Sequence, residues 1–176
     1  MIDSKISPTS GCDGITKLVD NAKKHIQFLQ NLHASGVTLK TPSSESLRRY
    51  VELWLPLVVK NPKSDLIPPP DIAWLWHCHR LAPYRYLGYV RKRFKLNDED
   101  FIEAVLPFEF QEDNNSDNVN AIDTRNLWQE YYSEETFFLN ETSDKSTSDI
   151  ESQDSNRYLD GFDLLGTTER QATFLW

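Results

Sequence analysis

The chain has 176 residues, of which 39% are hydrophobic and 26% are charged, and its formal net charge is -8. This composition predicts one globular domain whose core needs neither disulfides nor a structural metal. The chain has two cysteines, and its longest apolar run covers only residues 53–59, so the sequence argues against a disulfide framework and a membrane span. The N-terminus lacks the basic-then-apolar layout of a secretory signal, and we expect a cytoplasmic protein.

Charge is unevenly distributed along the chain. Residues 72–97 carry six basic side chains and no acidic one, whereas residues 98–163 carry three basic and nineteen acidic side chains. Such asymmetry can mark an anion-binding surface, although charged helix faces are usually ordinary solvated surface.

The first predicted element is an amphipathic helix that follows a flexible N-terminus over residues 1–14. Apolar side chains recur there every three or four residues, which predicts one buried stripe: Ile15, Leu18, Val19, Ala22, Ile26, Leu29 and Leu32. We expect Gly36 to end this helix. His25 and His33 lie beside the stripe, and we expect boundary packing rather than metal binding, because no Cys, Asp or Glu completes a ligand spacing nearby.

A second helix should begin at Ser43 or Ser44, either of which can cap free amides, and should be kinked or ended by Pro56. The three prolines at 68–70 hold the chain extended up to Asp71, which is placed to cap the next helix. That helix, residues 72–82, is apolar nearly all round, a pattern typical of an element buried in a core.

Pro83 suits the first turn of a further helix that runs to about residue 94. We expect a short helix over 98–106, a loop over 111–120, a helix from Asp123 or Thr124 to about Ser133, and an acidic, Ser-rich disordered insert over 140–157.

A final helical segment, 158–176, completes the predicted domain with residues 15–139. Because the chain stops at Trp176 with no helix-ending signal, we expect it to belong to a longer protein. The fold class is therefore all-α, an irregular bundle of about five to seven helices with long acidic loops.

The stretch from Asp71 to Pro83 is the most distinctive part of the sequence, and we expect it to be the structural centre of the domain. Its key residues are Asp71, Trp74, Trp76, His77, Cys78, His79 and Pro83. On a helix, His77 and His79 are separated by about 200° of rotation and point to nearly opposite sides, so they should not chelate one ion.

Cys78 should be a buried, inert hydrophobe, because a cysteine nucleophile needs an exposed thiolate and an oriented base. We expect one of the two imidazoles, His77 or His79, to donate a hydrogen bond to a backbone carbonyl or a carboxylate in the core. The sequence contains no phosphate-binding or dinucleotide-binding glycine motif. It therefore predicts no catalytic, cofactor-binding or metal residues.

Basic residues on the helix after Pro83 form the one candidate ligand site. Arg85, Lys92 and Lys95 recur at helical spacing on one side, and Gly88 leaves room between them. Tyr84 and Tyr89 flank this side with rings able to stack on a base. The alternative is a solvated face, or one covered by the acidic segment that follows.

The sequence resembles the glycine-rich domain-containing protein family. The segments that carry the resemblance are Arg49–Tyr50, Trp54–Leu57 and Ile67–Pro83, with flanking elements at Ala22–Ile26, Phe28–Leu29, Trp128, Tyr131, Tyr132, Glu169–Gln171 and Phe174. It covers most of residues 15–176, and the acidic insert is the main departure.

The resemblance implies a domain without an established biochemical activity, whose plant relatives are associated with development and stress responses. Some relatives carry an RNA-binding segment and a glycine-rich tail, neither of which is visible in this chain. The leading hypothesis is a non-enzymatic helical scaffold or protein-interaction domain with an unknown protein partner. The alternatives are an RNA- or anion-binding module that uses the basic helix, and, third, a cysteine- or metal-dependent enzyme.

Overall fold

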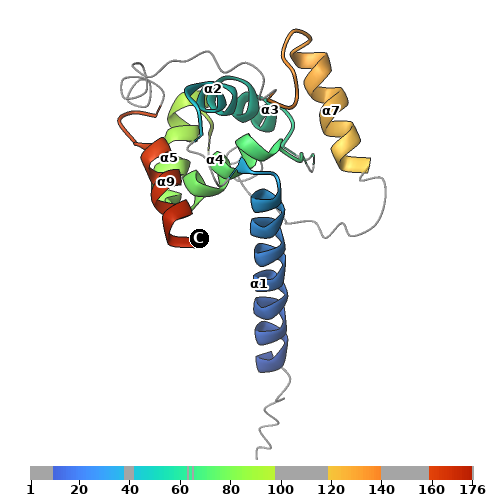
Figure 1. Ribbon diagram of the computed structural model, residues 1–176, viewed down its shortest axis with the longest axis vertical. Helices are drawn as coiled ribbons and strands as arrows, with labels where there is room; N and C mark the ends of the chain where they lie inside the picture. Colours follow the sequence, from blue (N-terminus) through green and yellow to red (C-terminus); the bar gives the residue numbers. More distant parts are fainter. Residues whose placement is uncertain are drawn as a thin grey trace, which may run out of the picture.

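The computed structural model describes residues 10–37, 42–62, 64, 66–97, 119–139 and 159–175. All regular elements in these ranges are helices, which confirms the predicted all-α class (Figure 1). They are α1 (Ser10–Ala34), α2 (Ser44–Arg48), η2 (Arg49–Trp54), α3 (Leu55–Lys60), α4 (Pro70–Arg80), α5 (Pro83–Phe94), α7 (Val119–Tyr131) and α9 (Leu164–Leu175). The short helix expected over 98–106 lies outside the described residues. The acidic insert expected over 140–157 also lies outside them.

Helices α2, η2 and α3 follow one another without a break. Ser43 caps α2 as predicted, because its hydroxyl accepts a hydrogen bond from the amide of Ser46 at 3.1 Å. Pro56 does not end the helix, which continues to Lys60. The six residues before α3 form a wider π-helical turn, which relieves the clash between a proline ring and the carbonyl four residues earlier.

Helix α4 is the buried centre of the fold, and eight of its eleven residues are buried. The prediction that Asp71 caps this helix was wrong, since the N-cap is Pro69 and Pro70 occupies the first turn. A proline at the first helical position costs no hydrogen bond, so the helix begins earlier and Asp71 lies in its first turn. Pro83 begins α5 as predicted, and Leu81 lies beyond the end of α4, 53% exposed.

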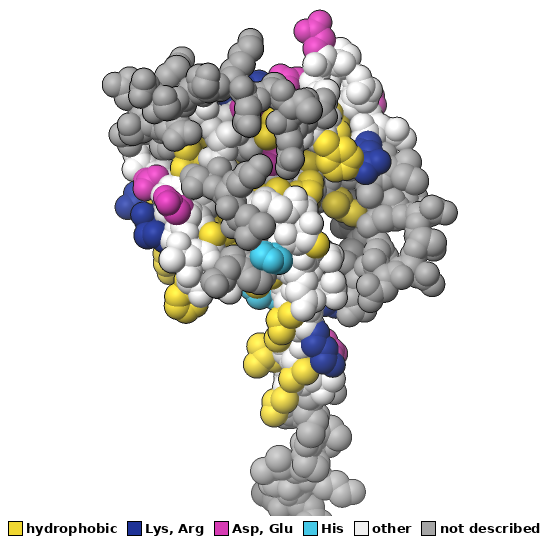
Figure 2. Space-filling model, in the orientation of Figure 1, with side chains coloured by type: hydrophobic (Ala, Val, Ile, Leu, Met, Phe, Trp, Pro, Cys, Tyr) yellow, Lys and Arg dark blue, Asp and Glu magenta, His cyan; other side chains and the backbone are white. Residues whose placement is uncertain are grey.

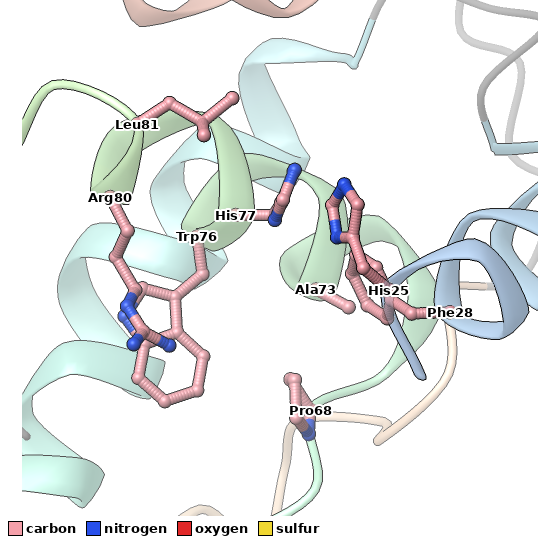
Figure 3. A pocket seen from close by; sticks show the side chains of 8 residues that line it. All are labelled: His25, Phe28, Pro68, Ala73, Trp76, His77, Arg80 and Leu81. Carbon is pink, nitrogen blue, oxygen red and sulfur yellow. The ribbon is translucent and has the colours of Figure 1, made fainter. Parts of the chain in front are cut away.

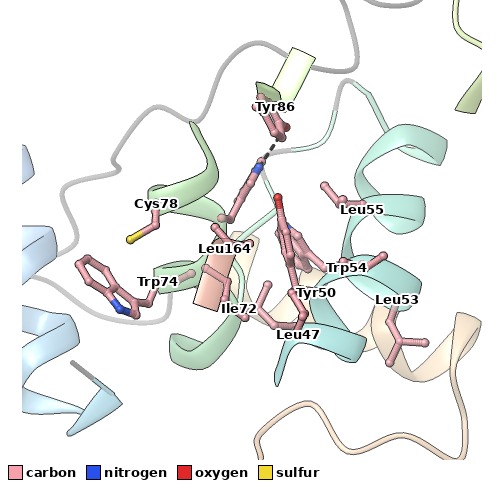
Figure 4. Close-up of a cluster of buried hydrophobic side chains, with 14 of the residues drawn as sticks. Leu47, Tyr50, Leu53, Trp54, Leu55, Ile72, Trp74, Cys78, Tyr86 and Leu164 are labelled. Carbon is pink, nitrogen blue, oxygen red and sulfur yellow. Dashed lines mark hydrogen bonds between the residues drawn. The ribbon is translucent and has the colours of Figure 1, made fainter. Parts of the chain in front are cut away.

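The hydrophobic core surrounds α4 and is rich in aromatic rings (Figure 4). The π-helical turn contributes Tyr50 and Trp54, α4 contributes Trp74, and all three are fully buried. Helix α7 contributes Trp128, and α9 closes the core with Leu164. Each large ring buries a large apolar area, so these side chains contribute strongly to the stability of the core.

The predicted buried stripe of α1 is mostly exposed, which corrects the sequence-based expectation. Ile15 is 67% exposed, Leu18 70% and Ile26 54%. The helix extends away from the rest of the fold, and its apolar side chains lie along this free part (Figures 1 and 2). Only the C-terminal turns dock, through Phe28, Leu29 and the buried Leu32. Periodicity predicts an apolar face correctly but does not say what covers it.

Helix α7 begins at Val119, four residues before the earliest predicted start, and it touches the loop that leads into α4. The Ile67 amide donates a hydrogen bond to the Thr124 hydroxyl at 3.0 Å. The Tyr132 hydroxyl, just after α7, donates to the Leu53 carbonyl at 2.8 Å. These two hydrogen bonds join the α7 region to Ile67 in the proline-rich loop and to Leu53 in η2. They therefore hold the N-terminal end of α4 in place.

Candidate functional site

His77 and His79 leave α4 in different directions, as their spacing predicts. His79 is 1% exposed and shares a hydrogen bond of 2.8 Å between its Nδ1 and the Tyr50 hydroxyl. The expectation of a carbonyl or carboxylate partner is thus corrected for His79, because the neighbouring π-helical turn places a phenol there. Burial lowers the pKa of His79 to about 4, so the ring is neutral at pH 7.

His77 points instead toward α1, where its ring centroid lies 5.1 Å from that of His25 and 5.2 Å from that of Phe28. It also stacks on Trp74, with ring centroids 5.8 Å apart. Burial, then the nearby His25 and Arg80, lower the pKa of His77 to about 4. His77 is therefore a neutral imidazole at an interface between two helices.

A pocket of about 300 Å³ opens between α1 and α4 next to His77 (Figure 3). Helical spacing places Ala73, His77 and Arg80 on one face of α4, and this face forms one wall. The lining residues are His25, Phe28, Pro68, Ala73, Trp76, His77, Arg80 and Leu81. The Arg80 guanidinium lies 5.4 Å from the centroid of the Trp76 ring, so a cation and an aromatic surface share the same cavity.

Cys78 is fully buried, as predicted, and burial raises its pKa to about 12. A thiol with this pKa is almost entirely protonated at neutral pH and is a poor nucleophile. In the described part of the chain, no group of three or more His, Cys, Asp or Glu side chains is arranged to hold a metal ion.

Burial of Cys78 leads to a prediction about thiol labelling. In a Cys12→Ser variant, Cys78 should react with a small disulfide reagent at pH 8 at least roughly a hundredfold more slowly in the native state than in urea, because the native thiolate is scarce and enclosed. The released thiolate is measured by absorbance. Native labelling at the rate found in urea would contradict both the burial and the raised pKa.

Arg49 is a buried arginine that connects three parts of the fold. It is 1% exposed, and its guanidinium donates a hydrogen bond of 2.6 Å to the Phe137 carbonyl after α7. Its Nε lies 3.9 Å from Oδ2 of Asp71, an ion pair too long for a hydrogen bond, and neither atom has a hydrogen-bond partner among the described residues. Burial raises the pKa of Asp71, while the charge of Arg49 opposes this shift. The pair fixes the start of α4 against η2.

Replacing Arg49 with methionine keeps much of the apolar stem but leaves Asp71 without its cation. We expect Arg49→Met to lower the free energy of unfolding by about 3 kcal/mol, the lower end for breaking a buried ion pair, because Asp71 can neutralise itself by binding a proton. Urea denaturation measures this loss. The control is Arg170→Met on the exposed side of α9, where a change below about 0.5 kcal/mol is expected. Equal effects of the two substitutions would contradict the role of Arg49.

The basic side chains predicted to bind an anion do not converge on one point. Arg85 and Lys95 are exposed, but they lie ten positions apart, at the start of α5 and just after its end, which is about 15 Å along a helix. The Lys92 ammonium pairs with Asp160 at 2.8 Å, an acidic residue beyond the insert. Of the two flanking rings, Tyr84 is 92% exposed but Tyr89 is buried, which corrects its expected stacking role. The anion site on α5 stays a prediction.

The pocket between α1 and α4 was missed by the sequence analysis. The spacing of His77 and Arg80 could have indicated that both face one side of α4. Nothing in the sequence indicates that His25 lies opposite, since that depends on how α1 docks. Arg49 was also missed, because a single arginine within an apolar run does not reveal its partners.

Residues 3–88 match the family model described as glycine-rich domain-containing protein-like. The family resemblance inferred from the sequence is confirmed. The matched region covers α1 to the middle of α5 and includes both the pocket and the pair of Arg49 and Asp71.

Two plant proteins of Arabidopsis thaliana extend this similarity to most of the chain. Glycine-rich domain-containing protein 1 is 29% identical over 172 residues, which cover 90% of this chain and 19% of that protein. Glycine-rich domain-containing protein 2 is 29% identical over 175 residues, which cover 90% of this chain and 20% of that protein. The chain thus spans about a fifth of the length of these relatives. No solved structure matches it, and no helix in the described residues could span a membrane.

Proposed function

We propose that this chain is a non-enzymatic protein-interaction domain that binds an amphipathic helix of a partner protein along the exposed stripe of α1. The stripe consists of Ile15, Leu18, Val19, Ala22 and Ile26, all exposed. The proposal includes a cytoplasmic location and a contribution to development or stress responses, in line with the family resemblance.

The observation that carries the proposal is that the apolar stripe of α1 docks only at its C-terminal end. At 100° per residue, Leu18 and Ala22 lie within about 20° of Leu29, which packs against the core. Ile26 is 54% exposed although it lies level with the docked turns. The stripe therefore continues the docked face toward the N-terminus, where its side chains are exposed in the described part of the chain.

The stripe has the chemistry of a helix-binding surface. Its residues repeat every three or four positions, and Lys17, Asp20 and Lys24 lie toward the back of the helix. Lys23 lies at the edge of the stripe, where it pairs with Asp20 at 3.6 Å and is exposed. A second helix can therefore pack along the stripe without desolvating a charge. The length from Ile15 to Ile26 is about 17 Å, room for about three turns of a partner helix.

A non-enzymatic role is supported by the burial of two side chains that could otherwise act as a nucleophile or a base. Cys78 is buried with a raised pKa, and His79 is bonded to Tyr50 inside the core. Neither group reaches a surface where a substrate could approach.

Site-specific photo-crosslinking tests the proposal in cells that express the intact protein. A photoreactive residue at Val19 or Ala22 should crosslink to one partner, and mass spectrometry should place the link on the apolar face of an amphipathic helix. The same residue at Asp20 or Lys24, on the back of α1, is the matched control and should give no such product. A synthetic peptide of the linked segment should bind the purified protein, and Leu18→Glu should weaken this binding at least tenfold, because a charge would be desolvated.

Three outcomes would overturn the proposal. Links to a second copy of this chain would identify self-association instead. Equal products from Val19 and Asp20 would show that the stripe is not selective. Peptide binding that survives Leu18→Glu would place the contact elsewhere.

A further inference from the structure

The pocket between α1 and α4 combines a permanent cation with two imidazoles and apolar walls. Its lining brings together Arg80 and two histidines, His25 and His77, in a volume of about 300 Å³ (Figure 3). None of the eight described lining residues is acidic. This surface does not overlap the exposed stripe of α1, so the inference goes beyond the proposed function.

The electrostatics of the pocket favour a negative charge. A guanidinium is always protonated at physiological pH, and it offers planar donors that match a carboxylate in bidentate geometry. The positive influence of Arg80 and His25 is visible at His77, whose pKa both residues help to lower. An anion bound beside these groups would act in the opposite direction and stabilise the protonated form of His77.

The apolar walls favour a small flat ring next to that charge. Phe28 lies on the α1 side, Trp76 on the α4 side, and Pro68 forms the base of the cavity as seen in Figure 3. A volume of about 300 Å³ is at the lower end for ligand pockets, which limits the occupant to one or two fused rings. Pockets of this kind take up apolar groups by burial and orient them with a few polar contacts.

We propose that this pocket binds a small aromatic carboxylate, with the carboxylate held by Arg80 on the Trp76 side and the ring placed toward Phe28, His25 and His77 on the other side (Figure 3). The helix carrying His25 supplies one wall and α4 supplies the other, so the bound molecule would bridge α1 and α4. Binding would therefore also stabilise the docked position of α1.

Isothermal titration calorimetry with three probes tests which chemical groups of a ligand the intact protein recognises. 2-Naphthoate should bind with a stoichiometry of one. 2-Naphthamide, which has the same shape without the charge, should bind at least tenfold more weakly, because the charged hydrogen bonds are lost. Inorganic phosphate, which has charge without a ring, should also bind at least tenfold more weakly.

Variants locate the site and keep the test independent of folding defects. Arg80→Gln should weaken the binding of 2-naphthoate at least tenfold, while Arg170→Gln, on the exposed side of α9, should leave binding unchanged. His25→Gln is the second variant, because it lies on α1 outside the core, and it should weaken binding without altering the melting temperature of the free protein. Proton NMR should show the pKa of His77 rising on addition of 2-naphthoate.

Several results would overturn the proposal. One is the absence of saturable 2-naphthoate binding by the wild type. Another is equal affinity for 2-naphthoate and 2-naphthamide, which would indicate an apolar cavity only. Unchanged binding in a folded Arg80→Gln or His25→Gln variant would place the molecule outside this pocket. None of these results bears on the stripe of α1, so the two proposals fail separately.

Discussion

Lowering the pH from 7 to 4 is expected to reduce the free energy of unfolding by about 6 kcal/mol, because two imidazoles must become charged inside the fold. The pKa values of His77 and His79 are lowered from 6.5 to about 4, mainly by burial. Each shift corresponds to roughly 3 kcal/mol between the two protonation states. Because the unfolded chain binds these protons more readily, the stabilisation is complete above pH 6.5 and is lost as the pH falls toward 4.

Asp71 acts in the opposite direction and reduces the net effect. Burial raises its pKa, so the unfolded chain releases this proton more readily than the folded one, and its contribution favours the fold at low pH. This stabilising contribution of Asp71 is lost as the pH rises through its raised pKa. The two histidines together should outweigh it between pH 6.5 and 4.

Urea denaturation at half-unit pH steps measures this profile. The variants His77→Gln and His79→Gln should each flatten it by roughly half, while His33→Gln, an exposed position near the end of α1, should leave it unchanged. A stability that is constant from pH 6.5 to 4, or a profile that stays equally steep in both variants, would contradict the expectation.

Trp76→Ala should lower the free energy of unfolding by about 3 to 5 kcal/mol, the usual range for truncating a buried large aromatic ring. Trp76 is 8% exposed and packs edge-on against Trp54, with ring centroids 5.5 Å apart. Its indole nitrogen donates a hydrogen bond of 3.0 Å to the Tyr86 hydroxyl. The alanine leaves a cavity between three helices and removes the donor to a buried phenol.

Denaturation midpoints of three variants separate these contributions. Trp76→Phe keeps most of the ring and should lose less than Trp76→Ala, because it removes the hydrogen bond but little of the packing. The control, Tyr84→Ala at a position 92% exposed, should change stability by less than about 0.5 kcal/mol. A loss below about 1 kcal/mol for Trp76→Ala would mean that the ring does not pack as the structure places it.

Position 76 also lies between the core and the pocket, so its two roles need separate measurements. A folded Trp76→Phe variant that loses stability but still binds 2-naphthoate would assign the indole nitrogen to the core. Loss of both would show that the core and the pocket share this side chain. The pocket proposal rests on Arg80 and His25 in either case.

The local features of the fold follow from the sequence. The cap at Ser43, the start of α5 at Pro83 and the burial of Cys78 depend on side chains close in sequence and on apolar content. The divergence of His77 and His79 follows from helix geometry alone. These predictions are confirmed because each feature depends on only a few neighbouring residues.

Tertiary structure decided what lies opposite each of these side chains. The stripe of α1 has helical periodicity, yet its free part is exposed because the core is built mainly from α2, η2, α3, α4, α5, α7 and α9. Periodicity defines a face but not its partner. Likewise, Pro56 continues a helix because a π-helical turn precedes it, and His79 meets Tyr50 because of that same turn.

The pocket shows the same division between sequence and structure. The sequence by itself determined an all-α chain with a buried aromatic helix at its centre, through composition, periodicity and capping, which act over a few residues. Only the docking of α1 brought His25 to face His77 across the pocket, and only the packing of η2 against α4 placed Arg49 next to Asp71. Contacts between distant segments depend on how helix faces pack together, and many packings satisfy the same pattern of apolar residues.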